Sequence, residues 1–162
     1  PRRDPDESPS AHRFRRARDA AHLDGLLPAG PEKRRHLREM HAFILGFAAT
    51  DADAEAAPLV VWEGSHGIIR SAFAAAFKDV APDDWPGIDM TGIYKAARRD
   101  VFERCARRVL PLRRGQAVLV HRHAIHGVAP WAAPADAPPR AVAYFRPAPP
   151  AGFAADWTLA AP

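Results

Sequence analysis

Two short motifs carry the side chains that could do chemistry. His22 and Asp24 lie two positions apart in AHLDG, and His121, His123 and His126 lie close together further along the chain. In an extended strand, residues i and i+2 project from the same face, so His22 and Asp24 can reach one metal ion together. The second motif can supply the further imidazole that such an ion needs.

The order of these residues favours one kind of metal centre. Two imidazoles and one carboxylate, with the opposite side left open, are the ligand set of non-haem Fe(II) oxygenases. His22, Asp24 and His126 provide this set. Arg140 follows after a Pro/Ala-rich loop, and its planar guanidinium can form a two-pronged contact with the far carboxylate of 2-oxoglutarate. These residues together predict a metal centre that takes a 2-oxo acid.

The crowded histidines allow an alternative. Gly115 followed by His121-x-His123 is the opening of a first cupin motif. That motif needs a Glu four or five residues later, where this chain has Gly127 or Val128, and the second cupin motif is missing. A cupin-like metalloenzyme using His121, His123 and His126 stays open as an alternative.

The elements that position these residues follow from the apolar pattern. Four apolar runs of strand length are present, at 41–50, 58–66, 117–121 and 141–145. Apolar residues at every fourth position, with arginines on the other side, predict one long helix over 91–110. Shorter helices are expected at 31–40 and 68–77, with a Pro-rich loop at 79–89. The fold class is therefore mainly β with helical additions, in a sandwich or jelly roll.

The chain has the length of one domain. We expect a basic N-terminal tail at 1–20, the folded domain at 21–147 and a Pro/Ala-rich C-terminal tail at 148–162.

Composition and charge exclude several classes of protein. No apolar run reaches the 18 residues that a membrane span needs, and the single cysteine, Cys105, excludes an internal disulfide, which fits a reducing cytoplasm. The net charge is +4 and the isoelectric point is about 9.8. The basic runs lack interleaved aromatic residues, so we expect no nucleic-acid partner. A basic chain would attract small acidic substrates.

Four segments of the chain resemble the phytanoyl-CoA dioxygenase family of Fe(II)/2-oxoglutarate oxygenases. The segments are AHLDG, APLVVWEGSH, GQAVLVHRHAIHG and PRAVAYFRP, within residues 21–147. The resemblance implies a double-stranded β-helix, a cupin-like jelly roll. It also implies that His22, Asp24 and His126 bind iron and that Arg140 binds the 2-oxoglutarate carboxylate.

The same resemblance extends to the pocket. Phe43 or Ile44 would line the cosubstrate pocket, His121 and His123 would line it or fix nearby loops, and Arg146 would be the second choice for the carboxylate partner. The implied reaction hydroxylates a small organic substrate with O2 while 2-oxoglutarate is decarboxylated to succinate.

The chain departs from the family pattern at three places. Glu63 replaces the usual Pro before Gly-Ser-His, and Val128 replaces the Ser or Thr that is usual two residues after the distal histidine. Only 21 residues precede His22, where the family has a strand and several helices, so we expect an N-terminally truncated jelly roll. A truncated jelly roll that binds a ligand without turnover is therefore a second alternative. Its unpaired sheet edge would invite oligomerisation.

Overall fold

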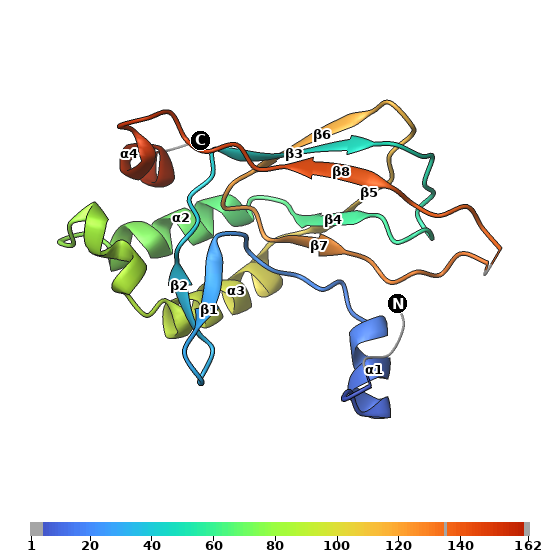
Figure 1. Cartoon of the computed structure of the whole chain (residues 1–162), viewed down its shortest axis with the longest axis horizontal. Helices are drawn as coiled ribbons and strands as arrows, with labels where there is room; N and C mark the ends of the chain where they lie inside the picture. Colours follow the sequence, from blue (N-terminus) through green and yellow to red (C-terminus); the bar gives the residue numbers. More distant parts are fainter. Residues whose placement is uncertain (1–4, 135, 161–162) are drawn as a thin grey trace.

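Two antiparallel sheets of three strands form the framework of the protein (Figure 1). The computed structural model describes residues 5–134 and 136–160. One sheet has the order β6 (Ala117–His121), β3 (Phe43–Ala48), β8 (Val142–Phe145), and the other has the order β5 (Arg107–Leu110), β4 (Leu59–Trp62), β7 (His126–Val128). Ile44, Leu59 and Val120 fill the space between the sheets.

Helices and a hairpin pack at one end of the sheets (Figure 1). They are β1 (Leu26–Ala29), β2 (Arg34–Leu37), α2 (Ser65–Ala76), the 3-10 helix η1 (Pro82–Gly87), α3 (Thr91–Arg104) and α4 (Ala154–Leu159). Their larger core includes Phe73, Trp85 and Val101, all less than 4% exposed. The expected architecture, antiparallel sheets with helical additions, is confirmed at this level. None of the described helices is long and apolar enough to cross a membrane.

The helix expected at 91–110 is shorter in the structure, and its last residues form a strand. Helix α3 ends at Arg104, and Cys105 already has extended backbone angles. The next residues form β5, which pairs with β4 so that Arg107 lies opposite Trp62. The four-residue repeat continues to Val109 by coincidence, because that side chain is 37% exposed on an edge strand.

The expected helix at 31–40 is wrong. Residues 34–37 form β2, which pairs with β1 in an antiparallel hairpin. Gly30 and Lys33 both have positive φ angles, and the Lys33 amide donates to the Gly30 carbonyl oxygen at 3.1 Å. This turn reverses the chain where the charged composition had suggested a helix.

Both terminal segments contain helices. Helix α1 (Pro9–Arg16) extends away from the sheets (Figure 1), whereas residues 1–4 lie outside the described part. Helix α4 contacts the body, since Thr158 is buried and the Trp157 indole donates to the Ala42 carbonyl oxygen at 3.0 Å. Residues 161–162 also lie outside the described part.

Residues 19–22 run alongside β7 and bring the first motif to the second. The amides and carbonyls of His22 and His126 exchange hydrogen bonds of 2.8 and 3.1 Å. The Val128 amide donates to the Asp19 carbonyl oxygen at 2.8 Å. Between these contacts lies Gly127, where a Cβ atom would come within 2.2 Å of the Asp19 oxygen. Only glycine allows the two segments to approach this closely.

We predict that Gly127→Ala destabilises the fold by about 1–3 kcal/mol, because the added methyl group forces residues 19–22 away from β7. The measurement is the free energy of unfolding in urea. Gly92→Ala is the matched control, because nothing lies within 4 Å of its Cβ position in α3 and alanine favours a helix. Equal stability of Gly127→Ala and the parent would contradict the close approach.

Candidate metal centre

The structure brings His22, Asp24 and His126 to one point. Their potential ligand atoms all lie within 4.8 Å of one another. The His22 Nε2 atom is 3.2 Å from Asp24 Oδ1, and the His126 Nε2 atom is 3.7 Å from Asp24 Oδ2. Among the described residues this is the one group of three or more His, Cys, Asp or Glu side chains that could hold a metal ion. We call it the triad.

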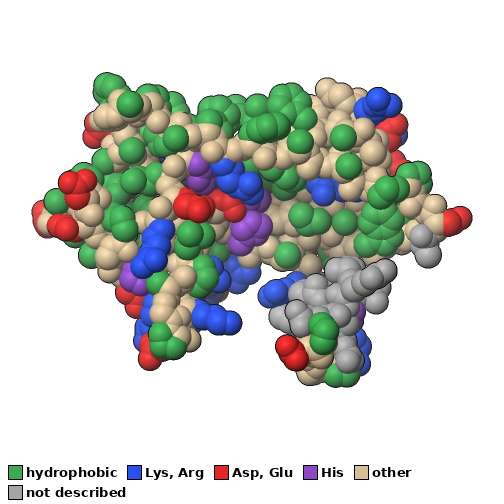
Figure 2. Space-filling model, viewed as in Figure 1, with side chains coloured by type: hydrophobic (Ala, Val, Ile, Leu, Met, Phe, Trp, Pro, Cys, Tyr) green, Lys and Arg blue, Asp and Glu red, His purple; other side chains and the backbone are tan. Residues whose placement is uncertain are grey.

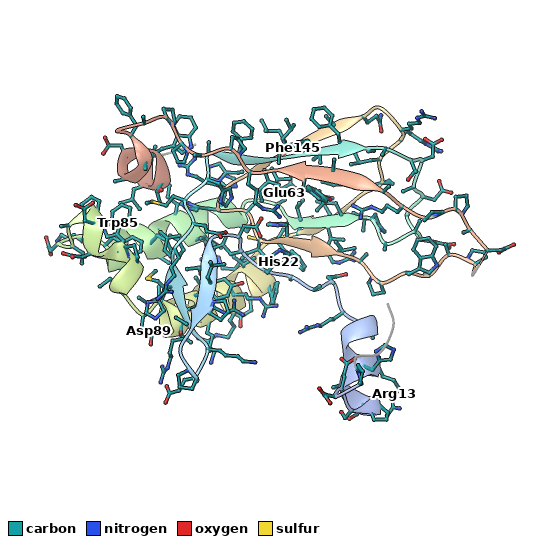
Figure 3. The ribbon with its side chains drawn as sticks, in the orientation of Figure 1. Arg13, His22, Glu63, Trp85, Asp89 and Phe145 are labelled. Atoms are coloured by element: carbon teal, nitrogen blue, oxygen red, sulfur yellow. The ribbon has the colours of Figure 1, made fainter. Side chains whose placement is uncertain are left out.

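Backbone pairing and a turn position the triad. His126 is the first residue of β7 and lies opposite Val61 of β4, while His22 forms a bridge to His126. Figure 3 accordingly shows His22 at the middle of the molecule, close to the start of β7. Asp24 precedes Gly25, whose φ of 87° and close contact with the Glu39 carbonyl oxygen exclude a side chain. The turn at Gly25 therefore directs the Asp24 carboxylate back towards the two rings.

Backbone carbonyls determine which nitrogen of each ring faces the carboxylate. The Nδ1 atom of His22 lies 2.8 Å from the Ala20 carbonyl oxygen, and Nδ1 of His126 lies 2.9 Å from that of Ala124. A carbonyl oxygen only accepts, so each Nδ1 carries the proton. In the neutral rings both Nε2 lone pairs are then free on the side of Asp24. Such second contacts hold metal-binding histidines in one tautomer and orientation.

Charge at the triad is balanced around one ionised carboxylate. Burial by itself would raise the pKa of Asp24, but hydrogen bonds from His22 and Arg146 outweigh it and hold that pKa well below its usual range. The hydrogen bond to Asp24 raises the pKa of His22. Burial lowers the pKa of His126, which keeps this ring neutral as a metal ligand requires.

One side of the triad is open. The His22 side chain is 49% exposed, whereas Asp24 and His126 are 13% and 7% exposed. Figure 2 shows histidine, acidic and basic side chains together at the centre of this face of the molecule. The donor set, the common tautomer and the open side together fit a metal ion with protein ligands on one face and exchangeable positions on the other.

Arg146 is the arginine that contacts the triad. Its Nε donates to Asp24 Oδ2 and forms an ion pair with it. Arg140 lies before β8, about 20 Å along an extended strand from Arg146, and donates to the Tyr144 hydroxyl at 3.0 Å. Nothing in the sequence distinguishes the two arginines, because they flank the same apolar run at 141–145. The role of Arg140 in binding a cosubstrate stays a prediction.

The other residues expected in the pocket lie partly in the core between the sheets and partly in a cluster of aromatic rings. Ile44 is 1% exposed and packs between the sheets, while its half-buried neighbour Phe43 pairs with His121 and points to the opposite face. The rings of His121 and His123 are 5.6 Å apart at their centroids, and Phe73 lies 5.2 Å from His123. A pocket role for these residues stays a prediction.

The cupin-like arrangement does not form among the described residues. His121, His123 and His126 do not bring three ligand atoms together, since His126 belongs to the triad. Burial, followed by the charge of Arg122, lowers the pKa of His121 to about 4 and that of His123 to about 3. Both rings are therefore neutral near pH 7, and His121 Nε2 and His123 Nδ1 are buried without a hydrogen-bond partner.

Comparisons with known proteins give little further information. No family matches the chain, and no curated protein matches it. Among solved structures, the chain is similar to the non-heme alpha ketoglutarate dependent carbocyclase SnoK from nogalamycin biosynthesis, at 19% sequence identity and a TM-score of 0.46. The similarity covers 79% of this chain and 42% of SnoK, so the chain spans less than half the length of that protein.

We predict that Arg146→Met raises the affinity of the triad for Mn(II) by about tenfold, because the guanidinium and the metal compete for the Asp24 carboxylate. Titration with Mn(II) followed by electron paramagnetic resonance measures this affinity. Arg140→Met is the matched control, because Arg140 precedes β8 and bonds to Tyr144, and it should leave the affinity unchanged. A weaker affinity in Arg146→Met would show that Arg146 supports the ligand geometry.

We predict that His123→Phe makes the fold less sensitive to acid. Because the pKa of His123 is about 3 in the folded protein against an ordinary 6.5, the unfolded chain binds more protons between these values, and stability is lost as the pH falls below 6.5. The parent should lose about 2 kcal/mol more than the variant between pH 7 and pH 5. Urea unfolding at several pH values measures the difference, and parallel curves would contradict it.

Proposed function

We propose that the protein is an Fe(II)/2-oxoglutarate-dependent oxygenase that hydroxylates a small organic substrate. The observation that carries this proposal is the convergence of His22, Asp24 and His126 within 4.8 Å. Two imidazoles and a carboxylate with an open side are the ligand set of this enzyme class. When bound, Fe(II) with 2-oxoglutarate and O2 would supply the oxidising power for hydroxylation, and 2-oxoglutarate would leave as succinate and CO2.

The residues of this chain would position the reactants. His126 and Asp24 form the buried side of the triad and His22 its exposed side, so substrate would approach past His22. Arg146 stands beside Asp24 and would be free to contact a carboxylate once a metal neutralises Asp24. Arg140 is the alternative partner of that carboxylate. Both arginines offer the planar pair of donors that a carboxylate accepts.

The proposal includes a double-stranded β-helix and membership of the phytanoyl-CoA dioxygenase family. Support for the fold comes from the path of the chain between the two sheets. From β3 to β8 the chain crosses from one sheet to the other at every step except between β4 and β5, as it does in a jelly roll. Residues 19–22 would act as a further strand beside β7. Support for the family comes from the four segments that resemble it, all within residues 21–147.

We predict that the protein, purified anaerobically and mixed with Fe(II) and 2-oxoglutarate, develops the weak visible charge-transfer band of the ternary complex. His22→Ala should abolish this band, because two protein ligands do not hold the metal. His36→Ala is the matched control, since His36 lies on β2 and bonds to the Pro86 carbonyl oxygen. Addition of O2 should then yield succinate in the parent and in His36→Ala, but not in His22→Ala.

Two results would contradict the proposal. A band that survives in His22→Ala would place the metal elsewhere. Metal binding at the triad without any band or succinate would leave a binding protein without turnover, which is the second alternative from the sequence.

A further inference from the structure

A basic cleft begins at the exposed side of the triad. It has a volume of about 550 Å³, which is within the range of small-molecule sites. Its lining includes His22, Glu32, Lys33, Arg35, Lys95 and Arg98. His22 is the one lining residue that belongs to the triad, so a molecule in the cleft could contact the exposed side of the triad at His22.

The charges of the cleft are nearly all of one sign. Five lining residues are Lys or Arg, and Glu32 is the single acid. Glu32 is already paired with Arg34, at 2.8 Å. Among the described residues, no carboxylate forms an ion pair with Lys33, Arg35, Lys95 or Arg98. Cations gathered on a concave surface create a positive potential that attracts anions.

Two guanidinium groups of the cleft are held in place by backbone oxygens. Arg98 donates one NH2 hydrogen to the Ala21 carbonyl at 3.2 Å, and its guanidinium stacks 4.4 Å from the centre of the Phe102 ring. Arg35 donates from NH1 to the Leu26 carbonyl at 3.2 Å. Each contact uses part of the five-donor fork, so the remaining N–H groups stay available for a ligand. Pre-positioned donors lose less entropy on binding.

The cleft is framed by elements that are already rigid. Arg35 lies on β2 and Lys95 and Arg98 lie on α3, and the Arg35 amide donates to the Thr91 hydroxyl at 2.7 Å. Lys95 and Arg98 are three positions apart on the helix and therefore lie on one face. The hairpin and the helix thus present cations to the same space from two sides.

We propose that the substrate is a small organic molecule carrying a phosphate group, which Arg35, Lys95 and Arg98 bind in the basic cleft. Phosphate fits this cleft because its several oxygens can accept from two guanidinium forks and an ammonium group at once. The carbon to be oxidised would lie at the His22 end. The oxidation of this molecule rests on the proposed function. The binding of its phosphate group does not, because the cleft and its charges come from the protein alone.

The test measures anion binding in metal-free buffer at about 0.15 M ionic strength. Pyrophosphate is the probe, malonate is the carboxylate comparison and a single-stranded oligonucleotide is the nucleic-acid comparison. Arg98→Gln and Arg35→Gln should each weaken pyrophosphate binding at least tenfold. Arg104→Gln is the matched control on the same helix, because Arg104 pairs with Asp100 outside the cleft, and it should change the affinity less than twofold.

A second variant tests the cleft even if the arginine variants do not fold. Lys95 is exposed, so Lys95→Gln should fold normally and weaken binding several-fold. Backbone amide shifts on pyrophosphate addition should concentrate at β2 and the first turns of α3. The proposal is overturned if pyrophosphate does not bind, if Arg104→Gln weakens it equally, or if malonate or the oligonucleotide binds more tightly through the same residues.

A separate Mn(II) titration distinguishes this proposal from the proposed function. Arg104→Gln should leave Mn(II) affinity unchanged as well, because Arg104 pairs with Asp100 away from the cleft and the triad. Pyrophosphate binding without Mn(II) binding would refute the oxygenase proposal and leave the anion site. Mn(II) binding without pyrophosphate binding would refute the anion site alone.

Discussion

The close pairing of residues 19–22 with β7 is the constraint on which the rest of the site depends. It places His22 opposite His126, and the turn at Asp24 and Gly25 then directs the Asp24 carboxylate to the same two rings. The pairing is possible because Gly127 has no side chain where the Asp19 carbonyl oxygen crosses it. Backbone hydrogen bonds thus bring a motif near residue 22 beside a motif near residue 126 and so form the candidate metal centre.

The Asp24 carboxylate is the electrostatic centre of this arrangement. It faces two imidazoles and one guanidinium, and the guanidinium of Arg146 comes from the other sheet. An ionised carboxylate that is 13% exposed needs positive charge beside it. The Arg146 guanidinium meets that need, so a divalent cation would replace charge that is already present. Metal binding would therefore exchange one cation for another at Asp24. The metal affinity would then depend on Arg146 as well as on the three side chains of the triad.

The sequence predicted the parts of the fold and site that depend on local spacing. The strand run 117–121 matches β6, and His22 and Asp24 do converge as predicted. The extended strand expected at His22 and Asp24 is wrong, because Asp24 lies in the turn that Gly25 forms. Pairing between strands far apart in the chain determined the features that the sequence did not predict. Residues 107–110 become β5 only because β4 offers a partner. Arg140 and Arg146 flank β8 at opposite ends, so the choice between them depends on which end of β8 lies near Asp24.

The three side chains of the triad differ in burial, so the triad is open on one side only. His126 is closed off by β7 and its neighbours, while His22 opens into a cleft in which Lys and Arg outnumber acids five to one. A ligand with a negative group is drawn to the cleft before any part of it reaches the metal, because Coulomb attraction acts over a longer range than coordination. Five of the 23 Lys and Arg residues of the chain line this cleft, so part of its basic character lies beside the open side of the triad.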